Sequence, residues 1–282
     1  MSYREPVEHL SIRLEDIKLA TKNFDEKNFI SGGGFGRVYK GELVHSGRRV
    51  MVAVKRLDRT GGQGEAQFWN EISILSDYKH ENIIKLLGFS DEGDEKLLVY
   101  EYLPMQSLNM HLSSGKLSWV DRLNVCIGVA RGLKHLHTHT PSVTKQFVLH
   151  SDIKSYNILL DTKWNAKISD FGLSRVVPVV VEHNATSFHF NTVEGTKGYC
   201  DPAYINSGCL TKENDVYSFG VLLFEMFLTI LIIPRSTDGI QYLEGGEDEF
   251  SGTITSTEKQ PLLQQQTCSF FEEGGDANGR WN

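Results

Sequence analysis

Cysteine is scarce in this sequence of 282 residues, which holds four: Cys126, Cys200, Cys209 and Cys268. They form no CxxC pair and no metal-like spacing, so we expect reduced thiols rather than a disulfide framework or a metal centre. A strong charge of one sign is lacking too, because 29 basic residues face 36 acidic ones and the net charge is −7. General nucleic-acid binders usually show a basic surface, so we expect no nucleic-acid partner.

Long apolar runs are also lacking. The longest, from Phe219 to Ile233, contains Glu225 and falls short of the about 20 residues that a membrane-spanning helix needs. We interpret it as a buried helix. The N-terminus shows neither the apolar stretch of a secretory signal nor the Met-Gly start of a myristoylation site. The sequence therefore predicts an intracellular protein without a transmembrane segment.

Strand-like patterns come first along the chain and helical periodicity comes later, which predicts an α+β arrangement of two segregated lobes. The expected elements are a short helix over 12–21, β-hairpins over 29–57, a helix over 65–78, apolar runs at 83–89 and 96–103, and a long helix over 117–137. The segment from about 234 to 282 is rich in Gly, Thr, Gln and acidic residues without a period, and disorder is expected there.

A glycine-rich stretch, Ser31 to Gly36, lies between two of the strand-like runs. Any flexible turn could carry such a stretch, so it is weak evidence when taken alone. Because no helix follows it, it is neither a Rossmann nor a Walker-type loop. A glycine hairpin does let backbone N–H groups approach phosphate oxygens without interference from a Cβ.

Lys55 ends the apolar run that begins at Val52. A lone lysine in that place is usually an edge residue whose ammonium reaches solvent. Glu71, on the helix that follows, offers the opposite charge needed to hold the ammonium over the α- and β-phosphates of a nucleotide.

The strongest signal is a pair of linked segments, 150–157 (HSDIKSYN) and 170–172 (DFG). Together they match the H-x-D-x-K-x-x-N catalytic loop and the D-F-G metal site of protein kinases. The chemistry requires these residue types, because one carboxylate must orient the attacking hydroxyl while a second carboxylate and an amide oxygen hold Mg²⁺. Each piece alone could be an ordinary turn, but the ordered set indicates phosphoryl transfer.

With these motifs the chain resembles the receptor-like kinases of plants and their soluble cytoplasmic relatives, a group akin to the Pelle and interleukin-receptor-associated kinases. The resemblance covers about Leu10 to Thr229 and includes the segments 20–24 (ATKNF), 98–104 (LVYEYLP) and 215–220 (DVYSFG). It implies a bilobal kinase fold, with an antiparallel β-rich N-lobe carrying one main helix and a mostly helical C-lobe.

The resemblance implies four catalytic residues. Asp152 would be the catalytic base, Lys154 would steady the γ-phosphate and Lys55 would pair with Glu71. A lysine at position 154 resembles the serine/threonine class, and Thr196 resembles the residue that shapes the substrate-docking loop.

ATP and Mg²⁺ are the implied cofactors, and Asn157 and Asp170 would hold the metal. Val38 and Ala53 would line the adenine pocket beside the gatekeeper Tyr100. The backbone of Glu101 and Leu103 would bond the adenine edge. The full set of implied nucleotide-binding residues is Ile30, Gly33, Gly36, Val38, Ala53, Lys55, Tyr100, Glu101, Leu103, Asn157 and Asp170.

By the same resemblance, the substrate is a protein with Ser or Thr hydroxyls, and the partner is a membrane receptor or co-receptor. The expected location is the cytoplasm, at the inner face of the plasma membrane through that partner. The expected organisation is a short helical segment over 1–23, the N-lobe and hinge over 24–103, a partial C-lobe over 104–229, and a divergent tail over 230–282.

Three positions depart from the family pattern. Ser31 replaces the first loop glycine, Ser151 replaces the arginine before the catalytic aspartate, and Ala203 replaces a glutamate that normally pairs with a late C-lobe arginine. The resemblance is expected to fade after about Thr229, so that the C-lobe would be incomplete. Two functions remain open: an active serine/threonine kinase, or a pseudokinase-like module that binds ATP or a partner without turnover.

Overall fold

The computed structural model describes residues 5–33, 36–45, 47–58, 63–138, 146–178, 188–189 and 193–228. All of them lie within one compact unit, residues 1–252. The expected tail over 230–282 lies outside the described residues, as do positions 34 and 35 of the glycine-rich stretch.

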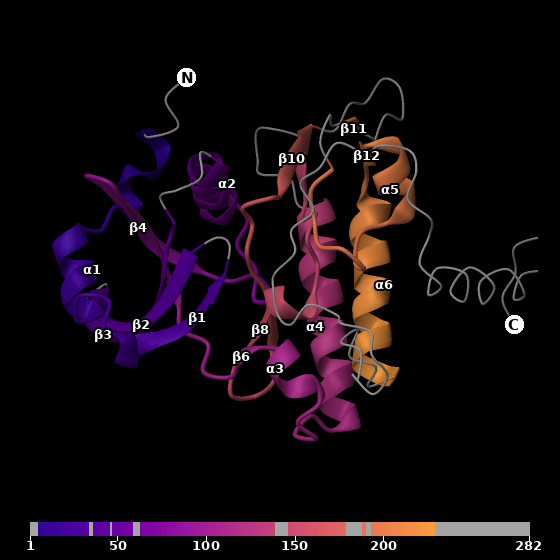
Figure 1. Ribbon diagram of the computed structural model, residues 1–282, viewed down its shortest axis with the longest axis horizontal. Helices are drawn as coiled ribbons and strands as arrows, with labels where there is room; N and C mark the ends of the chain where they lie inside the picture. The colour runs from indigo at the N-terminus through magenta and orange to yellow at the C-terminus, as the bar shows by residue number, and fades with distance from the viewer. Residues whose placement is uncertain are drawn as a thin grey trace, which may run out of the picture. The chain divides into compact units, whose positions relative to one another are not determined.

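An antiparallel sheet of five strands forms the N-terminal part, in the order β1-β2-β3-β5-β4 (Figure 1). Its strands are β1 (Phe29–Gly33), β2 (Gly36–His45), β3 (Arg48–Arg56), β4 (Leu86–Glu92) and β5 (Glu95–Glu101). The expected hairpins are confirmed. The polar turn between β4 and β5 is tighter than its sequence suggests, because the strands continue through Glu92 and Glu95 and only two residues connect them.

One face of this sheet is covered by the chain that precedes it. The 3₁₀ helix η1 (Glu5–Leu10) leads to α1 (Leu14–Ala20), whose Ile17 is fully buried. Ile17 packs in a cluster with the inward side chains of the strands, which are Tyr39, Leu43, Val52, Val54, Leu87, Leu97 and Val99. The outer sheet face is therefore sealed by this N-terminal segment.

The opposite face of the sheet packs against α2 (Gln63–Asp77). Phe68, Ile72 and Leu75 lie on one side of this helix at the i, i+4, i+7 spacing of an amphipathic helix. All three are buried in the largest hydrophobic cluster of the described residues, which includes Leu98 of β5 and Phe171. This packing places α2 beside the segment that holds the D-F-G motif.

Helices dominate the C-terminal part, as the sequence predicts. They are α3 (Asn109–Leu112), α4 (Trp119–Thr138), the 3₁₀ helix η3 (Ser155–Asn157), α5 (Pro202–Ser207) and α6 (Lys212–Leu228). A further 3₁₀ helix, η2 (Glu26–Asn28), lies earlier in the chain, just before β1. Short strands complete it: β6 (Gln106–Ser107), β7 (Gln146–Leu149), β8 (Ile158–Leu160), β9 (Ala166–Ile168), β10 (Arg175–Pro178), β11 (Phe188–His189) and β12 (Cys209–Leu210).

Helix α4 packs closely on β9 through two glycines. A Cβ at Gly132 would come within 2.8 Å of Ile168 Cδ1 and 2.9 Å of the Asn82 carbonyl oxygen. At Gly128 it would lie 3.0 Å from Asn82 Nδ2. On its other side α4 runs beside α6 (Figure 1), where the rings of Trp119 and Phe227 lie 4.8 Å apart.

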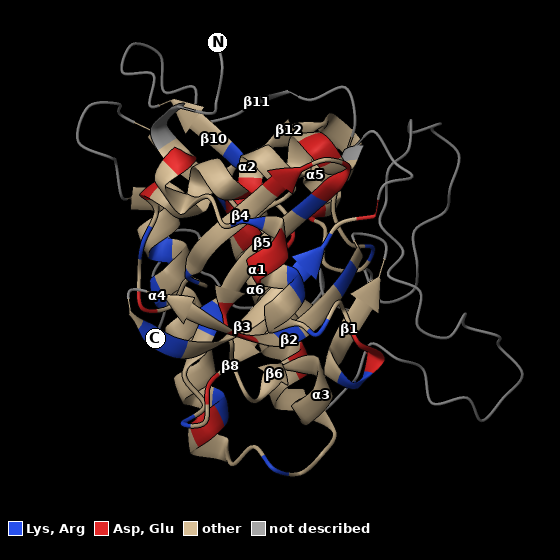
Figure 2. Cartoon of the chain, turned by 90° about the vertical axis from the view of Figure 1, so that its left-hand side faces the viewer, with Lys and Arg blue, Asp and Glu red and all other residues tan. Residues whose placement is uncertain are grey.

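Acidic and basic residues are interspersed over the elements instead of gathering by sign (Figure 2). This distribution agrees with the modest net charge of −7. Among the residues that the structure describes, no helix is both long and apolar enough to cross a bilayer.

Candidate active site

The register of the five-stranded sheet gathers four of the expected nucleotide-binding side chains. Val38 pairs with Lys55 across β2 and β3, while Ala53 of β3 pairs with Tyr100 of β5. Paired residues project to the same side of a sheet, as do residues two apart on one strand. Val38, Ala53, Lys55 and Tyr100 therefore share the face opposite the one that α1 covers.

The glycine-rich turn is closed by a Gly33–Gly36 pair between β1 and β2. Gly36 has φ +121°, and a Cβ there would lie 2.1 Å from the Arg56 carbonyl oxygen, so only glycine fits. Ile30 lies in β1 as well, followed by Ser31, which pairs with Val38. The register of β1 against β2 shifts between Phe29 and Ser31. Serine is tolerated at position 31 because its φ is not positive.

Lys55 joins the sheet to the rest of the site. Its Nζ lies 2.6 Å from Asp170 Oδ1 and 3.5 Å from Glu71 Oε2 of α2. Burial alone would lower the pKa of Lys55, but the charges of Asp170 and Glu71 outweigh it and raise that pKa. The pKa of Asp170 is lowered, because the Lys55 ammonium more than offsets burial. The expected Lys55–Glu71 pair is present, and Asp170 is the nearer partner.

Burial raises the pKa of Glu71 on the far side of this cluster. Tyr100 is buried beside it, and burial together with the charge of Glu71 raises the pKa of its phenol well above the ordinary value. Tyr100 therefore stays a buried, neutral phenol beside Glu71.

Asp152 lies in the loop between β7 and η3, where its carboxylate is held by three side chains. Thr196 Oγ1 donates to Oδ1 at 2.6 Å, and Asn157 Nδ2 donates to Oδ2 at 3.0 Å. Lys154 Nζ lies 2.9 Å from Oδ2 and also donates to Thr196 Oγ1 at 2.9 Å. The sequence brings Asp152, Lys154 and Asn157 together as expected, and the contact with Thr196 is additional.

Asn157 and Asp170 fit a divalent cation by their chemistry. The amide nitrogen of Asn157 is committed to the carbonyl oxygen of Asp152 at 2.8 Å as well as to its carboxylate. Its oxygen is therefore the end that remains to bind a metal. The lowered pKa of Asp170 keeps its carboxylate ionised, and Mg²⁺ prefers such oxygen ligands.

The backbone around Asp152 is fixed from α6 by Asp215. The carboxylate of Asp215 accepts hydrogen bonds from the amides of His150 at 2.8 Å and Ser151 at 2.9 Å, and lies 2.8 Å from His137 Nε2. Ser151 itself has φ +71°. Position 151 holds serine where the family pattern has arginine, and the loop is anchored through its main chain.

His150 orients the loop from within. The amide of Asp152 donates to His150 Nδ1 at 3.3 Å, so the ring proton resides on Nε2 and is donated to the Ser169 carbonyl at 3.1 Å. The His150 ring also meets Phe171 edge to face, with centroids 4.9 Å apart. The catalytic loop and the D-F-G segment are thereby joined.

At the edge of β5, the chain leaves the sheet at Glu101. Its amide donates to the Lys85 carbonyl at 3.1 Å, and its carboxylate lies 2.8 Å from Lys167 Nζ. The carbonyl of Leu103 accepts from the amide of Gln106 at 3.1 Å. The expected hinge residues, Glu101 and Leu103, therefore connect the sheet to the helical part.

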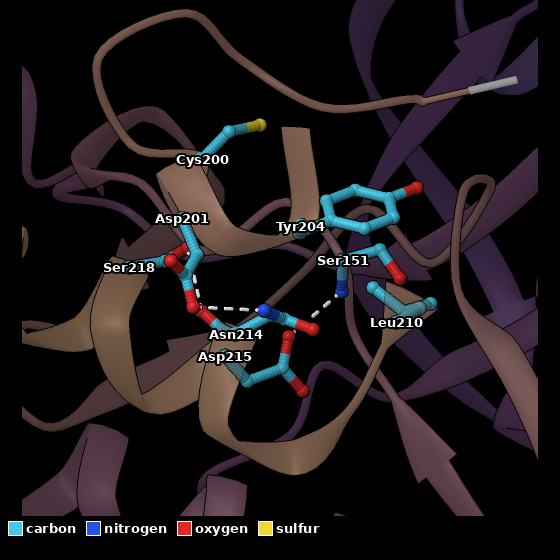
Figure 3. A pocket seen from close by; sticks show the side chains of 8 residues that line it. All are labelled: Ser151, Cys200, Asp201, Tyr204, Leu210, Asn214, Asp215 and Ser218. Atoms are coloured by element: carbon cyan, nitrogen blue, oxygen red, sulfur yellow. Dashed lines mark hydrogen bonds between the residues drawn. The ribbon is translucent and has the colours of Figure 1, made fainter. Parts of the chain in front are cut away.

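A small pocket lies behind the catalytic loop (Figure 3). Its lining residues are Ser151, Cys200, Asp201, Tyr204, Leu210, Asn214, Asp215 and Ser218. Asn214 donates to Asp201 there at 2.9 Å. Neither Lys55 nor Asp170 lines this pocket, so it is distinct from the sheet face that carries Lys55.

Asp201 also lies just before the helix that contains Ala203, the residue that replaces the glutamate of the family pattern. Its Oδ1 accepts from the amide of Ala203 at 2.8 Å and so caps α5, which begins at Pro202. Tyr204, one turn into the helix, is buried. The segment around Ala203 thus forms its helix without a side-chain ion pair at position 203.

Two polar residues beneath the site were missed by motif reasoning. Glu225 of α6 accepts from Ser155 Oγ at 2.9 Å and from the Tyr199 hydroxyl. Asn70 of α2 donates to three carbonyl oxygens just after Asp170. No sequence motif points to either residue, because each lies in a helix that is distant along the chain from the residues that it contacts.

Comparison with known proteins identifies the family of this domain. The protein kinase domain model matches residues 24–270, which extends past Thr229, where the sequence analysis expects the resemblance to fade. The putative receptor-like protein kinase At5g39000 of Arabidopsis thaliana is 47% identical over 264 residues, 86% of this chain and 29% of that protein. The receptor-like protein kinase FERONIA of the same plant is 45% identical, covering 74% of this chain and 23% of that protein.

The probable serine/threonine-protein kinase PBL22 of Arabidopsis thaliana is 45% identical over 83% of this chain and 60% of its own length. The chain thus spans only about a quarter of the receptor-like relatives that it matches (29% and 23%). The protein kinase domain model covers most of the chain, residues 24–270. The five-stranded sheet, the Lys55–Glu71 ion pair and the loop that carries Asp152 all lie within these residues. The chain belongs to the protein kinase domain family.

Proposed function

We propose that this chain is a protein serine/threonine kinase that transfers the γ-phosphate of MgATP to Ser or Thr hydroxyls of proteins. The observation that carries the proposal is the arrangement around Asp152, whose carboxylate is held by Thr196, Lys154 and Asn157. A carboxylate fixed in this way can orient a hydroxyl for attack, which is the main protein contribution to phosphoryl transfer.

In the proposed mechanism Asp152 accepts the hydroxyl proton, and Lys154 neutralises charge on the γ-phosphate. Lys55, held by Glu71 and Asp170, binds the α- and β-phosphates. Asn157 and Asp170 would hold Mg²⁺, which would supply charge neutralisation on the phosphates.

The same proposal assigns the nucleotide. Val38 and Ala53 line the adenine pocket with Tyr100 behind it. The backbone of Glu101 and Leu103 bonds the adenine edge, and Ile30, Gly33 and Gly36 cover the phosphates. The shared sheet face of Val38, Ala53 and Tyr100 supports this assignment. The name receptor-like protein kinase of two relatives supports a place in receptor-linked signalling. The proposed location is cytoplasmic, at the inner face of the plasma membrane through a receptor partner.

Phosphoryl transfer by the full chain tests the proposal, with myelin basic protein as acceptor and MgATP as donor. We expect phosphoserine and phosphothreonine by mass spectrometry, and a loss of about a hundredfold or more in Asp152→Asn. Asp152→Asn should still gain thermal stability from MgATP, because nucleotide contacts are intact. A MgATP-dependent rise in Tm without transfer would favour the binding module instead. If the chain shows neither a rise in Tm nor transfer, both the kinase and the ATP-binding module are rejected.

A further inference from the structure

Asn70 of α2 contacts the turn that follows the D-F-G aspartate. Its Nδ2 donates to the carbonyl oxygens of Phe171 at 3.0 Å, Gly172 at 3.0 Å and Ser174 at 2.8 Å. These carbonyls converge on one amide group, and the turn itself is closed by the Ser174 amide donating to the Phe171 carbonyl at 3.1 Å. An amide nitrogen carries two hydrogens, so at least one of them is shared between two of these carbonyl oxygens.

The residue next to Asn70 engages the same turn with the opposite polarity. Glu71 Oε1 accepts from the Phe171 amide at 3.3 Å, while its Oε2 faces Lys55. Two adjacent residues of α2 thus bind the backbone of residues 171–174: Asn70 donates to its carbonyl oxygens, and Glu71 accepts from one of its amides. Any rotation or displacement of α2 would break both sets of contacts together.

The turn is held from its other side by the catalytic loop. Ser174 Oγ donates to the His150 carbonyl at 3.0 Å, and the His150 ring meets Phe171. The turn is therefore docked between α2 and the loop that carries Asp152. Asp170, immediately before it, has φ +66°, a left-handed conformation that costs about 1 kcal/mol or more and persists only when its surroundings impose it.

We propose that Asn70 is a positioning residue for Asp170: by docking the 171–174 turn on α2, it sets where the Asp170 carboxylate meets Lys55 and the metal. The inference rests on the proposed kinase function and adds a residue that determines the site's geometry. It acts through backbone contacts only, so it requires an amide donor at position 70 and not merely a side chain of that size.

This requirement predicts an unusual order of effects. Asn70→Asp keeps the shape but places a carboxylate against three carbonyl oxygens, so it should be worse than Asn70→Leu, which only removes the donor. Asn70→Gln keeps an amide and should restore part of the loss. Asn124, an exposed asparagine of α4, provides matched controls as Asn124→Asp and Asn124→Leu.

The experiment compares these variants in the full chain by three readouts. We expect kcat to fall about tenfold or more in Asn70→Asp, since small misplacements of reacting groups cost that much. The Mg²⁺ concentration needed for the MgADP-induced rise in Tm should increase, whereas the response to ADP without metal should not. Hydrogen exchange should speed up in peptides covering residues 171–174 but not in α4.

Asn70 variants that match their Asn124 counterparts in all three readouts would overturn the inference. A larger loss of kcat in Asn70→Leu than in Asn70→Asp would also overturn it, because the shape of the side chain rather than its hydrogen-bond donor would then matter. If the wild-type chain transfers no phosphate, the proposed function fails on its own. The exchange and metal-response readouts still decide the role of Asn70.

Discussion

The thiol of Cys200 is partly buried close to the carboxylate of Asp152. It lies in the segment after Thr196, and a Cβ on Gly195 would come within 2.5 Å of its Sγ. Burial, and then the charge of Asp152, raise the pKa of the Cys200 thiol to about 12. A raised thiol pKa means that the neutral form persists through physiological pH, so Cys200 is a packing residue rather than a nucleophile.

We therefore expect alkylation of Cys200 by iodoacetamide in the folded chain to rise about tenfold per pH unit from pH 8 to 10 without levelling off, because the thiolate fraction grows in that proportion below the pKa. Peptide mapping by mass spectrometry measures the rate. In the denatured chain the rate should level off above the usual thiol pKa of about 8.5. A plateau below pH 9 in the folded chain would contradict the assignment.

At the scale of single elements, α4 and α6 use glycine for different reasons. Gly132 of α4 lies against Ile168 and the Asn82 carbonyl, and a methyl group has no room there. Gly220 of α6 has no atom of the described residues within 4 Å of the Cβ position. The first glycine permits close helix–strand packing, whereas the second only weakens its helix.

Opposite effects of one substitution follow from this difference. Gly132→Ala should lower the free energy of unfolding by about 1–2 kcal/mol, because overpacking outweighs the gain in helix propensity. Gly220→Ala should raise it by about 0.5–1 kcal/mol. Urea unfolding followed by circular dichroism measures both. Equal shifts in the two variants would refute the packing explanation for Gly132.

The elements themselves were within reach of the sequence. Period-2 alternation predicts the hairpins of β2 and β3, and the i, i+4 spacing of Phe68 and Ile72 predicts α2. The kinase motifs, and the resemblance that rests on them, also predict that Lys55, Glu71, Asp152 and Asp170 form one site. Contacts such as Asn70 to the 171–174 turn could not be predicted, because they depend on how separate elements pack and leave no local pattern.

For the whole described unit, the N-terminal segment is part of the fold rather than an appendage. Ile17 is fully buried on the outer sheet face, while Leu19, two residues on, is 81% exposed. The amide of Leu14 donates to Glu92 Oε1 at 3.0 Å, so a residue of β4 caps α1. Without this cover, the apolar side chains of four strands, β2, β3, β4 and β5, would meet water.

Ile17→Asp should accordingly lower the free energy of unfolding by about 3 kcal/mol or more, since an unpaired carboxylate would enter the core. Leu19→Asp on the same helix should stay within about 0.5 kcal/mol of the wild type. Thermal unfolding of the full chain distinguishes the two. Similar Tm values for both variants would mean that α1 does not seal the sheet.

The anchoring of the catalytic loop by Asp215 has a consequence for sequence variation. The carboxylate grips the amides of His150 and Ser151 and makes no demand on the side chain at position 151. The left-handed backbone of Ser151, with φ +71°, restricts which residues fit there, but an exchange of arginine for serine leaves the anchor from Asp215 in place. What the exchange alters is how the site responds to charge on the neighbouring segment, so regulation can diverge while the catalytic geometry is inherited unchanged.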